Sequence, residues 1–192
     1  DEVTDVFLTH LHFDHCGGAS FFNKKGGRNE VVFKNATYWS NREHWNWAKE
    51  PNSREKASFL TENLEPIESS GQLKFLEKID SGFNFYNEIG FELLFVDGHT
   101  EKQMIPKITY KGYDLVFTAD LIPTVGHIPV PYIMGYDIRP LTTMNEKAVF
   151  LEEVVKNKYL LFFQHDAHNQ IASLKETEKG VRLETVLDFN DI

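Results

Sequence analysis

The sequence predicts an α/β fold, because apolar strand-like runs and helix-like segments occur along the same chain. Four apolar runs indicate buried strands, at residues 3–8, 91–96, 113–118 and 159–163. A histidine or an aspartate follows each of these runs. Because sites in layered folds form in the loops just beyond strand ends, the four runs predict one shared site.

The first third of the chain predicts loop, strand and helix in turn. Residues 21–28 are expected to form a loop around Lys24-Lys25-Gly26-Gly27, and residues 31–33 a short strand. Ser40 and Asn41 are both good N-cap residues, so a helix should begin there and stop before Pro51.

The next segment predicts a second helix over residues 54–62, followed by a strand over residues 72–76. Pro66 and Gly71 are expected to lie in the link between them.

The last third predicts one more helix and a final strand. Thr143 and Glu146 fit a capping box at the start of a helix near Thr142. The charged run 176–179 should be solvated and should precede a strand at residues 181–184. The chain shows no internal repeat and no low-complexity linker, so we expect one domain over residues 1–192.

Composition narrows the classes of function. The net charge of −9 disfavours non-specific binding to nucleic acid or to anionic lipid, both of which require clustered Lys and Arg. The single cysteine, Cys16, excludes an internal disulfide framework and favours a cytoplasmic, reducing location. No apolar run approaches the ~20 residues of a transmembrane helix, and no signal peptide opens the chain.

The stretch after the first strand is rich in metal ligands. His10, His12, Asp14 and His15 lie within six positions, and imidazole and carboxylate groups are both ligands for transition metals. One metal cannot take all four from a short loop and keep an open position, so the spacing indicates two adjacent metals. His10 and His12 would bind one, and Asp14 and His15 the other. The alternative is a polar loop that is histidine-rich by chance.

The pattern His10-x-His12-x-Asp14-His15-x-Gly-Gly resembles the signature of the metallo-β-lactamase-fold hydrolases. The resemblance implies a four-layer αββα sandwich. In that family a sheet of several strands precedes the motif, whereas here the motif follows the first few residues. We therefore expect this sequence to lack its N-terminal strands, as a fragment of a longer protein would.

The resemblance also implies a complete ligand set. It assigns to the first metal His10, His12 and His99, and to the second metal Asp14, His15 and His165. Asp120 would bridge the two metals, as in the branch that contains the lactonases. A cysteine commonly replaces this aspartate in β-lactamases proper, which disfavours β-lactam hydrolysis. A glutamate commonly replaces His12 in the flavin-linked di-iron relatives, which disfavours a redox centre.

These assignments predict a binuclear metal-dependent hydrolase with two Zn²⁺ ions, other divalent transition metals being left open. Water or hydroxide would attack a small ester or lactone. Two alternatives are a phosphodiesterase or phosphotriesterase on the same site, and a metal-binding protein without turnover. We expect a small-molecule substrate, neither a nucleic-acid nor a membrane partner, and leave a homodimer open.

Residues outside the ligand set carry weaker predictions. We assign catalytic roles to Asp120, Asp14 and Tyr136, and substrate contacts to His127 and Tyr136. The alternatives are a structural hydrogen bond for His127 and core packing for Tyr136.

Five other side chains carry expectations of their own. We expect Cys16 to be a buried, inert thiol rather than a ligand, and His44 and His168 to lie at the surface. Trp45 and Trp47 are two residues apart, so on a helix their rings cannot share one face. We expect both to pack, or else one of them to contact a substrate or a partner.

Overall fold

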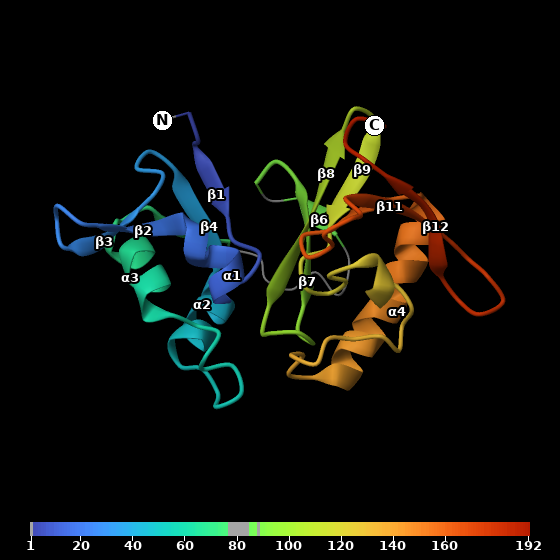
Figure 1. Ribbon diagram of the computed structural model, residues 1–192, viewed down its shortest axis with the longest axis horizontal. Coiled ribbons are helices and arrows are strands. Elements are labelled where there is room, and N and C mark those ends of the chain that lie inside the picture. The colour runs from blue at the N-terminus through green and yellow to red at the C-terminus, as the bar shows by residue number, and fades with distance from the viewer. Residues whose placement is uncertain (1, 77–84, 88) are drawn as a thin grey trace. The chain divides into compact units, whose positions relative to one another are not determined.

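The structure is a computed structural model that describes residues 2–76, 85–87 and 89–192. Contacts divide the chain into two compact units, Asp1–Ile79 and Asp80–Ile192. The first, or N-terminal unit, runs from blue to teal in Figure 1, and the second, or C-terminal unit, from green to red. Each unit has its own sheet and apolar core. The α/β class is therefore confirmed, while the single-domain organisation stays a prediction.

The N-terminal unit contains a parallel three-stranded sheet of order β1-β4-β5 and an antiparallel hairpin, β2-β3. Its strands are β1 Asp5–Phe7, β2 Ser20–Asn23, β3 Arg28–Val31, β4 Thr37–Asn41 and β5 Leu73–Leu76. Its helices are α1 Phe13–Cys16, the short 3-10 helix η1 Gly17–Ala19, α2 Arg42–Lys49 and α3 Thr61–Ser69. The predicted strand at 72–76 is confirmed by β5.

The first strand is shorter and more open than predicted. β1 spans three residues and pairs in parallel with β4. Its Asp5 is exposed, Val6 and Phe7 are half-buried, and Val3 before it is 36 % exposed. The predicted strand is therefore present, but its predicted full burial is wrong.

The predicted loop at 21–28 is wrong, because a β-hairpin occupies it. Phe21 and Phe22 belong to β2, and Phe21 pairs with Glu30 of β3. The Lys-Gly stretch is the turn of the hairpin, in which Gly27 has a φ of +65° and Asn23 Oδ1 accepts the N–H of Lys25. The breaker residues thus connect two strands instead of ending all regular structure.

Helix α2 agrees with its prediction, whereas the predicted helix at 54–62 is wrong. Asn41 caps α2 by accepting the N–H of His44 at 2.8 Å, and α2 ends at Lys49, before Pro51. After it, Asn52 Oδ1 accepts the N–H groups of Arg54 and Glu55. This local side-chain bonding competes with a helix, and α3 begins only at Thr61.

Pro66 lies inside α3 and not in the link after it. A proline has no N–H, so it leaves the carbonyl of Glu62, four residues earlier, without its helical donor. The hydroxyl of Ser20 donates to that carbonyl at 3.4 Å. This bond from the hairpin offsets part of the cost of the proline.

The C-terminal unit contains a seven-stranded sheet of order β12-β11-β10-β9-β8-β7-β6. The strands are β6 Tyr86–Asn87, β7 Glu92–Val96, β8 Gln103–Tyr110, β9 Tyr113–Phe117, β10 Leu160–Phe162, β11 Ile171–Lys175 and β12 Arg182–Leu187. Neighbours are antiparallel except β9 and β10, which run parallel. The three apolar runs predicted as strands in this half are confirmed by β7, β9 and β10.

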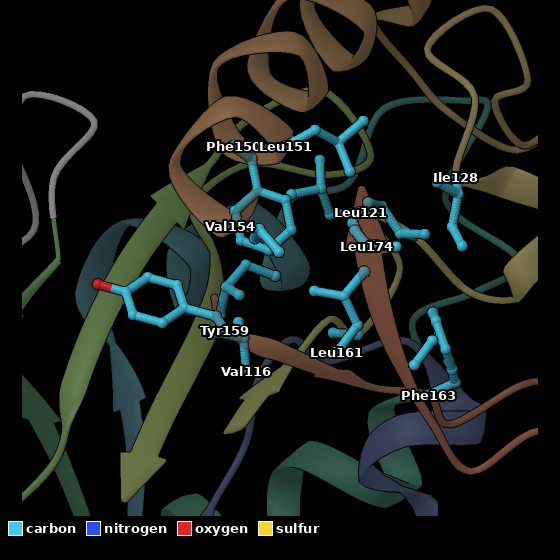
Figure 2. Packing of buried hydrophobic residues seen from close by; sticks show 14 of the residues in the cluster. Val116, Leu121, Ile128, Phe150, Leu151, Val154, Tyr159, Leu161, Phe163 and Leu174 are labelled. Carbon is cyan, nitrogen blue, oxygen red and sulfur yellow. The ribbon is translucent and has the colours of Figure 1, made fainter. Parts of the chain in front are cut away.

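Helix α4 (Pro140–Asn157) covers this sheet and builds the core of the unit. Figure 2 shows Phe150, Leu151 and Val154 of α4 pointing toward Val116 of β9 and Leu161 of β10. All five side chains are at most 2 % exposed. No helix of the described ranges is both long and apolar enough to cross a bilayer.

The predicted capping box of α4 is wrong. Pro140 begins the helix, as its fixed φ and missing N–H allow, so Thr143 and Glu146 lie within the first two turns. The carboxylate of Glu146 is used elsewhere: it accepts the N–H of Asp97 at 2.7 Å.

Candidate metal centre

The N-terminal unit gathers four of the predicted ligands directly after β1. His10 is fully buried and His12 is 7 % exposed, and their rings meet edge to face with centroids 4.8 Å apart. The ring centroid of His15 lies 3.9 Å from that of His10, and Asp14 Oδ2 lies 3.5 Å from His15 Nε2. Each neighbouring pair offers ligand atoms within 4.8 Å of one another. These four side chains therefore form one cluster.

The cluster lies on the turn that leads into the short helix α1. His12 is extended at the N-terminus of α1, and its carbonyl accepts the N–H groups of His15 and Cys16. The helix thus ends directly before the glycine pair, Gly17 and Gly18. Gly17 has φ −60° and ψ −30°, a helical conformation that any residue adopts, so its backbone does not require glycine.

His44 is buried, so the prediction of a surface position is wrong. It is 0 % exposed, and its Nε2 accepts the N–H of Leu11, between His10 and His12, at 2.8 Å. The available signal was the spacing of His44 and Ala48, which is one turn of a helix with a buried face. His44 therefore fixes the backbone of the ligand loop.

Cys16 is buried as predicted. It is 0 % exposed, and its Sγ donates to the carbonyl of Leu11 at 3.3 Å. Burial raises the pKa of the thiol to about 12. The thiolate is the form that binds metal and attacks electrophiles, so this environment supports the prediction that Cys16 is an inert thiol rather than a ligand.

Sequence reasoning missed Glu55 as a partner of this cluster. Its carboxylate is buried, with Oε1 at 3.4 Å from His12 Nε2 and Oε2 accepting from Trp47 Nε1 at 2.8 Å. The stretch around Glu55 was predicted as a helix, which concealed the turn that buries it. Trp45 is 2 % exposed and packs, while Trp47 is only half-buried.

The C-terminal unit gathers the other three predicted ligands. Asp120 Oδ2 lies 3.2 Å from His99 Nε2, and Asp120 Oδ1 lies 3.2 Å from His165 Nε2. His99 and Asp120 are buried, whereas the side chain of His165 is 35 % exposed. One carboxylate thus directs an oxygen toward each of two imidazoles, which is the arrangement that a bridging ligand requires.

Asp120 follows β9 in a tight turn. Ala119 has a φ of +41°, a left-handed conformation that is unfavourable for alanine, and the hydroxyl of Thr118 donates to the carbonyl of Ile122 at 2.7 Å. Backbone strain at this point shows that the surrounding contacts determine the direction of the Asp120 side chain.

His99 is held by the segment that leads into α4. Asp137 Oδ1 lies 2.9 Å from His99 Nδ1, and the N–H of Ile138 donates to the His99 carbonyl at 3.3 Å. Asp137 is 2 % exposed, and sequence reasoning had not assigned it a role. A carboxylate on Nδ1 selects the tautomer whose Nε2 lone pair faces a metal.

The backbone before His99 is clamped by the same segment. Glu146 accepts the N–H of Gly98 at 3.0 Å in addition to that of Asp97, and Arg139 donates its N–H to the Gly98 carbonyl at 2.9 Å. A Cβ on Gly98 would overlap Oγ1 and the backbone of Thr143. Helix α4 and the His99 loop are therefore in contact at a point that only glycine permits.

The pKa of Glu146 makes this clamp sensitive to pH. Burial raises the pKa of the carboxyl from 4.5 to about 7, against the opposing effect of the two N–H donors. Between these two values the folded state binds a proton that the unfolded state has released. The contribution of Glu146 to the free energy of unfolding therefore falls as the pH rises through this window.

We expect Glu146→Gln to flatten this pH dependence in the metal-free protein. The wild type should lose on the order of 2–3 kcal/mol more than the variant between about pH 5 and about pH 8. Urea unfolding at both pH values measures this, with exposed Glu152 of the same helix changed to Gln as the control. Equal slopes for wild type and Glu146→Gln would contradict the raised pKa.

The remaining predicted residues lie as follows. Tyr136 is 80 % exposed, so it does not pack in the core of its unit. His127 lies in the 3-10 helix η2 (Val125–His127), with Nδ1 at 2.8 Å from Thr124 Oγ1, and burial lowers its pKa. The structural hydrogen bond considered for His127 is thus present, whereas its contact with a substrate stays a prediction. His168 is exposed, as predicted.

Comparisons with known proteins extend these observations. The model of the metallo-beta-lactamase superfamily matches residues 1–179. No curated protein matches the chain. A probable metal-dependent hydrolase from Staphylococcus aureus is similar in structure, with a TM-score of 0.77, 23% identity, and coverage of 98% of this chain and 65% of the other.

Two solved lactonase structures are also similar. AidC, described as a dizinc quorum-quenching lactonase, has a TM-score of 0.76 at 20% identity, over 97% of this chain and 66% of the other. An N-acyl homoserine lactone hydrolase with a product at its catalytic metal centre has a TM-score of 0.61 at 23% identity, over 87% and 57%. This chain thus spans about two thirds of the length of the first two structures.

At these identities the structural likeness establishes the fold, and it confirms the predicted metallo-β-lactamase-like class. The family model covers most of the sequence, including all seven predicted ligands. The chain belongs to the metallo-β-lactamase superfamily.

Proposed function

We propose that the two ligand clusters combine in one binuclear metal centre of a hydrolase. In this proposal the first metal is bound by His10, His12 and His99, and the second by Asp14, His15 and His165, with Asp120 between them. The observation that carries it is the geometry of Asp120, whose two carboxylate oxygens each lie 3.2 Å from a different histidine. The second support is the clustering of the four other ligands within the N-terminal unit.

The donor chemistry fits zinc. Imidazole nitrogen and carboxylate oxygen are ligands that Zn²⁺ prefers. Cys16 also lies in this stretch of the chain, but burial raises the pKa of its thiol, so the sulfur stays protonated and is not counted as a ligand. Manganese, iron and cobalt accept the same donors, so the composition of the site supports a divalent transition metal of which zinc is the leading candidate. Bound zinc lowers the pKa of water to about 7 and polarises a carbonyl or phosphoryl oxygen.

The residues of this chain supply binding and orientation. Asp137 holds the Nδ1 side of His99, so that Nε2 faces Asp120. His44 holds the backbone between His10 and His12. Asp14 and His165 are the more exposed ligands, with side chains 43% and 35% accessible. They therefore suit the side on which a substrate would enter.

We propose a small ester as the substrate class, with a lactone as the leading candidate. Support comes from the bridging Asp120 and from the solved structures of similar fold that are described as lactonases. The exposed hydroxyl of Tyr136 is available to bond a substrate carbonyl, and His127 is proposed to contact the substrate. We propose a cytoplasmic location, which is supported by the single cysteine, because it leaves no pair for a disulfide within the chain. We propose no nucleic-acid or membrane partner.

The test combines metal analysis with kinetics. Protein reloaded with zinc should contain close to two equivalents, and kcat/KM should be higher for acyl lactones than for phosphodiesters or phosphotriesters. A preference for a phosphate ester would replace the lactonase proposal and leave the metal centre intact. Two tightly bound metals with no turnover on any of these substrates would support a metal-binding protein without catalysis. Failure to bind zinc would overturn the proposed centre.

A further inference from the structure

The buried carboxylate of Glu55 has no role in the ligand set, yet it lies beside one of the ligands. We propose that Glu55 is a positioning residue: it keeps the proton of His12 on Nε2, so that the Nδ1 lone pair is presented to the metal. The inference rests on the proposed function, because it assigns His12 as a ligand and adds which of its ring nitrogens binds.

The position of the Glu55 carboxylate is fixed by bonds within the N-terminal unit. Oε2 accepts from Trp47 Nε1 at 2.8 Å and from Asn52 Nδ2 at 2.5 Å. Asn52 Oδ1 in turn accepts the N–H of Glu55 at 3.1 Å, which closes the turn that carries it. One oxygen is thus occupied by two neutral donors, while Oε1 faces His12 Nε2 at 3.4 Å.

Because Glu55 is buried, the direction of its hydrogen bond with His12 decides which ring nitrogen of His12 carries the proton. Glu55 is 3 % exposed, and a buried carboxylate can only accept hydrogen bonds. A neutral imidazole has one N–H and one lone pair, so a carboxylate beside Nε2 favours the tautomer with the proton on Nε2. Nδ1 then carries the lone pair, and a metal binds through that atom.

The ring of His12 is also restrained from rotating. The Phe59 ring lies against it with centroids 4.8 Å apart, and His10 meets it edge to face at the same centroid distance. A flip of the ring by 180° about the Cβ–Cγ bond would put Cε1 in the place of Nε2, and the hydrogen bond to Glu55 would be lost. The packing and the hydrogen bond therefore select the same orientation.

Glu55 also resolves the two roles considered for Trp47. The indole N–H bonds the carboxylate, so Trp47 acts through Glu55 and not by touching a substrate with that group. The carboxylate of Asp137 lies beside a ring nitrogen of His99 in the way that Glu55 lies beside His12, but the nitrogen is Nδ1. Two of the three histidines assigned to the first metal, His12 and His99, thus each have a buried carboxylate, on different ring nitrogens.

The test uses Glu55→Gln and Glu55→Met, with exposed Glu65 of α3 changed to Gln as the matched control. The first readout needs no metal: ¹⁵N and ¹³C shifts of the His12 ring in metal-free protein, above the pH at which imidazole is protonated, report the tautomer. We expect the Nε2–H form in the wild type and in Glu65→Gln. In Glu55→Met, which has no acceptor, we expect a mixture of tautomers.

The second readout is zinc affinity, measured by competition with a chromophoric chelator. We expect both Glu55 variants to bind the first equivalent about 10- to 100-fold more weakly, as when other carboxylates behind metal-bound histidines are removed. Trp47→Phe keeps the carboxylate and should lose less affinity, with the tautomer unchanged. If Glu55→Met fails to fold, the zinc affinity is measured on Glu55→Gln and the tautomer of His12 is measured on the wild type.

Three results separate this inference from the proposed function. A wild-type His12 with its proton on Nδ1 would overturn the inference, even if two zinc ions bind. Wild-type zinc affinity in Glu55→Gln would also overturn it. A wild type with the Nε2–H tautomer that binds no zinc would instead overturn the metal centre and leave the orientation by Glu55 established.

Discussion

Replacing Asp120 with alanine is expected to reduce the zinc content of the protein from about two equivalents to one or fewer, and to abolish measurable hydrolysis. The carboxylate has one oxygen 3.2 Å from His99 Nε2 and the other 3.2 Å from His165 Nε2. Without it, the two histidines lose the group that holds them on a common centre. Asp120 is 5 % exposed, so water cannot freely replace the lost oxygens.

The measurement is metal analysis of protein reloaded with zinc, followed by kcat/KM on the best substrate. Asp114→Ala, at the other end of the preceding strand, is the control, because its carboxylate bonds only an exposed threonine hydroxyl, at 2.7 Å, among the bonds described for it. Asp120→Asn should retain more metal than Asp120→Ala, since one oxygen remains. Two equivalents of zinc and wild-type turnover in Asp120→Ala would exclude a bridging role.

The apolar runs pointed to the region of the ligands, because strand ends are a local signal, and the resemblance to the metallo-β-lactamase-fold hydrolases implied which side chains form the set. The structure places the seven predicted ligands in two clusters, one within each unit, and supplies what holds them. Those supporting groups could not be predicted, because they depend on contacts between distant segments. Glu146 bonds Asp97 from 49 residues away, and Glu55 reaches His12 from 43 residues away.

The errors in secondary structure have a related cause. The stretch containing Asn52 and Glu55 has a composition that suits a helix, but Asn52 bonds two backbone N–H groups and ends that possibility locally. The Lys-Gly stretch after Asn23 was recognised as a breaker, yet pattern alone did not show that two strands pair across it. In both cases a side-chain bond or a pairing partner decided between conformations that the residue types left open.

Gly98→Ala is expected to displace His99 by a steric route that involves no change in charge or ligand. A Cβ at this position would overlap Thr143 at Oγ1 and at the helix backbone. The backbone cannot yield locally, because Glu146 holds the N–H of Gly98 at 3.0 Å and Arg139 holds its carbonyl at 2.9 Å. Either the first turn of α4 or the His99 loop must move.

We expect this variant to lose on the order of 3 kcal/mol of unfolding free energy, as overpacking of a closed contact does, and to bind zinc more weakly because His99 shifts relative to Asp120. Urea unfolding and chelator competition measure the two effects. Gly135→Ala is the matched control, since its Cβ would meet no atom within 4 Å and its φ is not in the left-handed region. Adding Thr143→Ala to Gly98→Ala removes Oγ1 but leaves the helix backbone in place, so it should restore little of either property. A Gly98→Ala protein as stable and as tight for zinc as Gly135→Ala would show that the contact with α4 does not position His99.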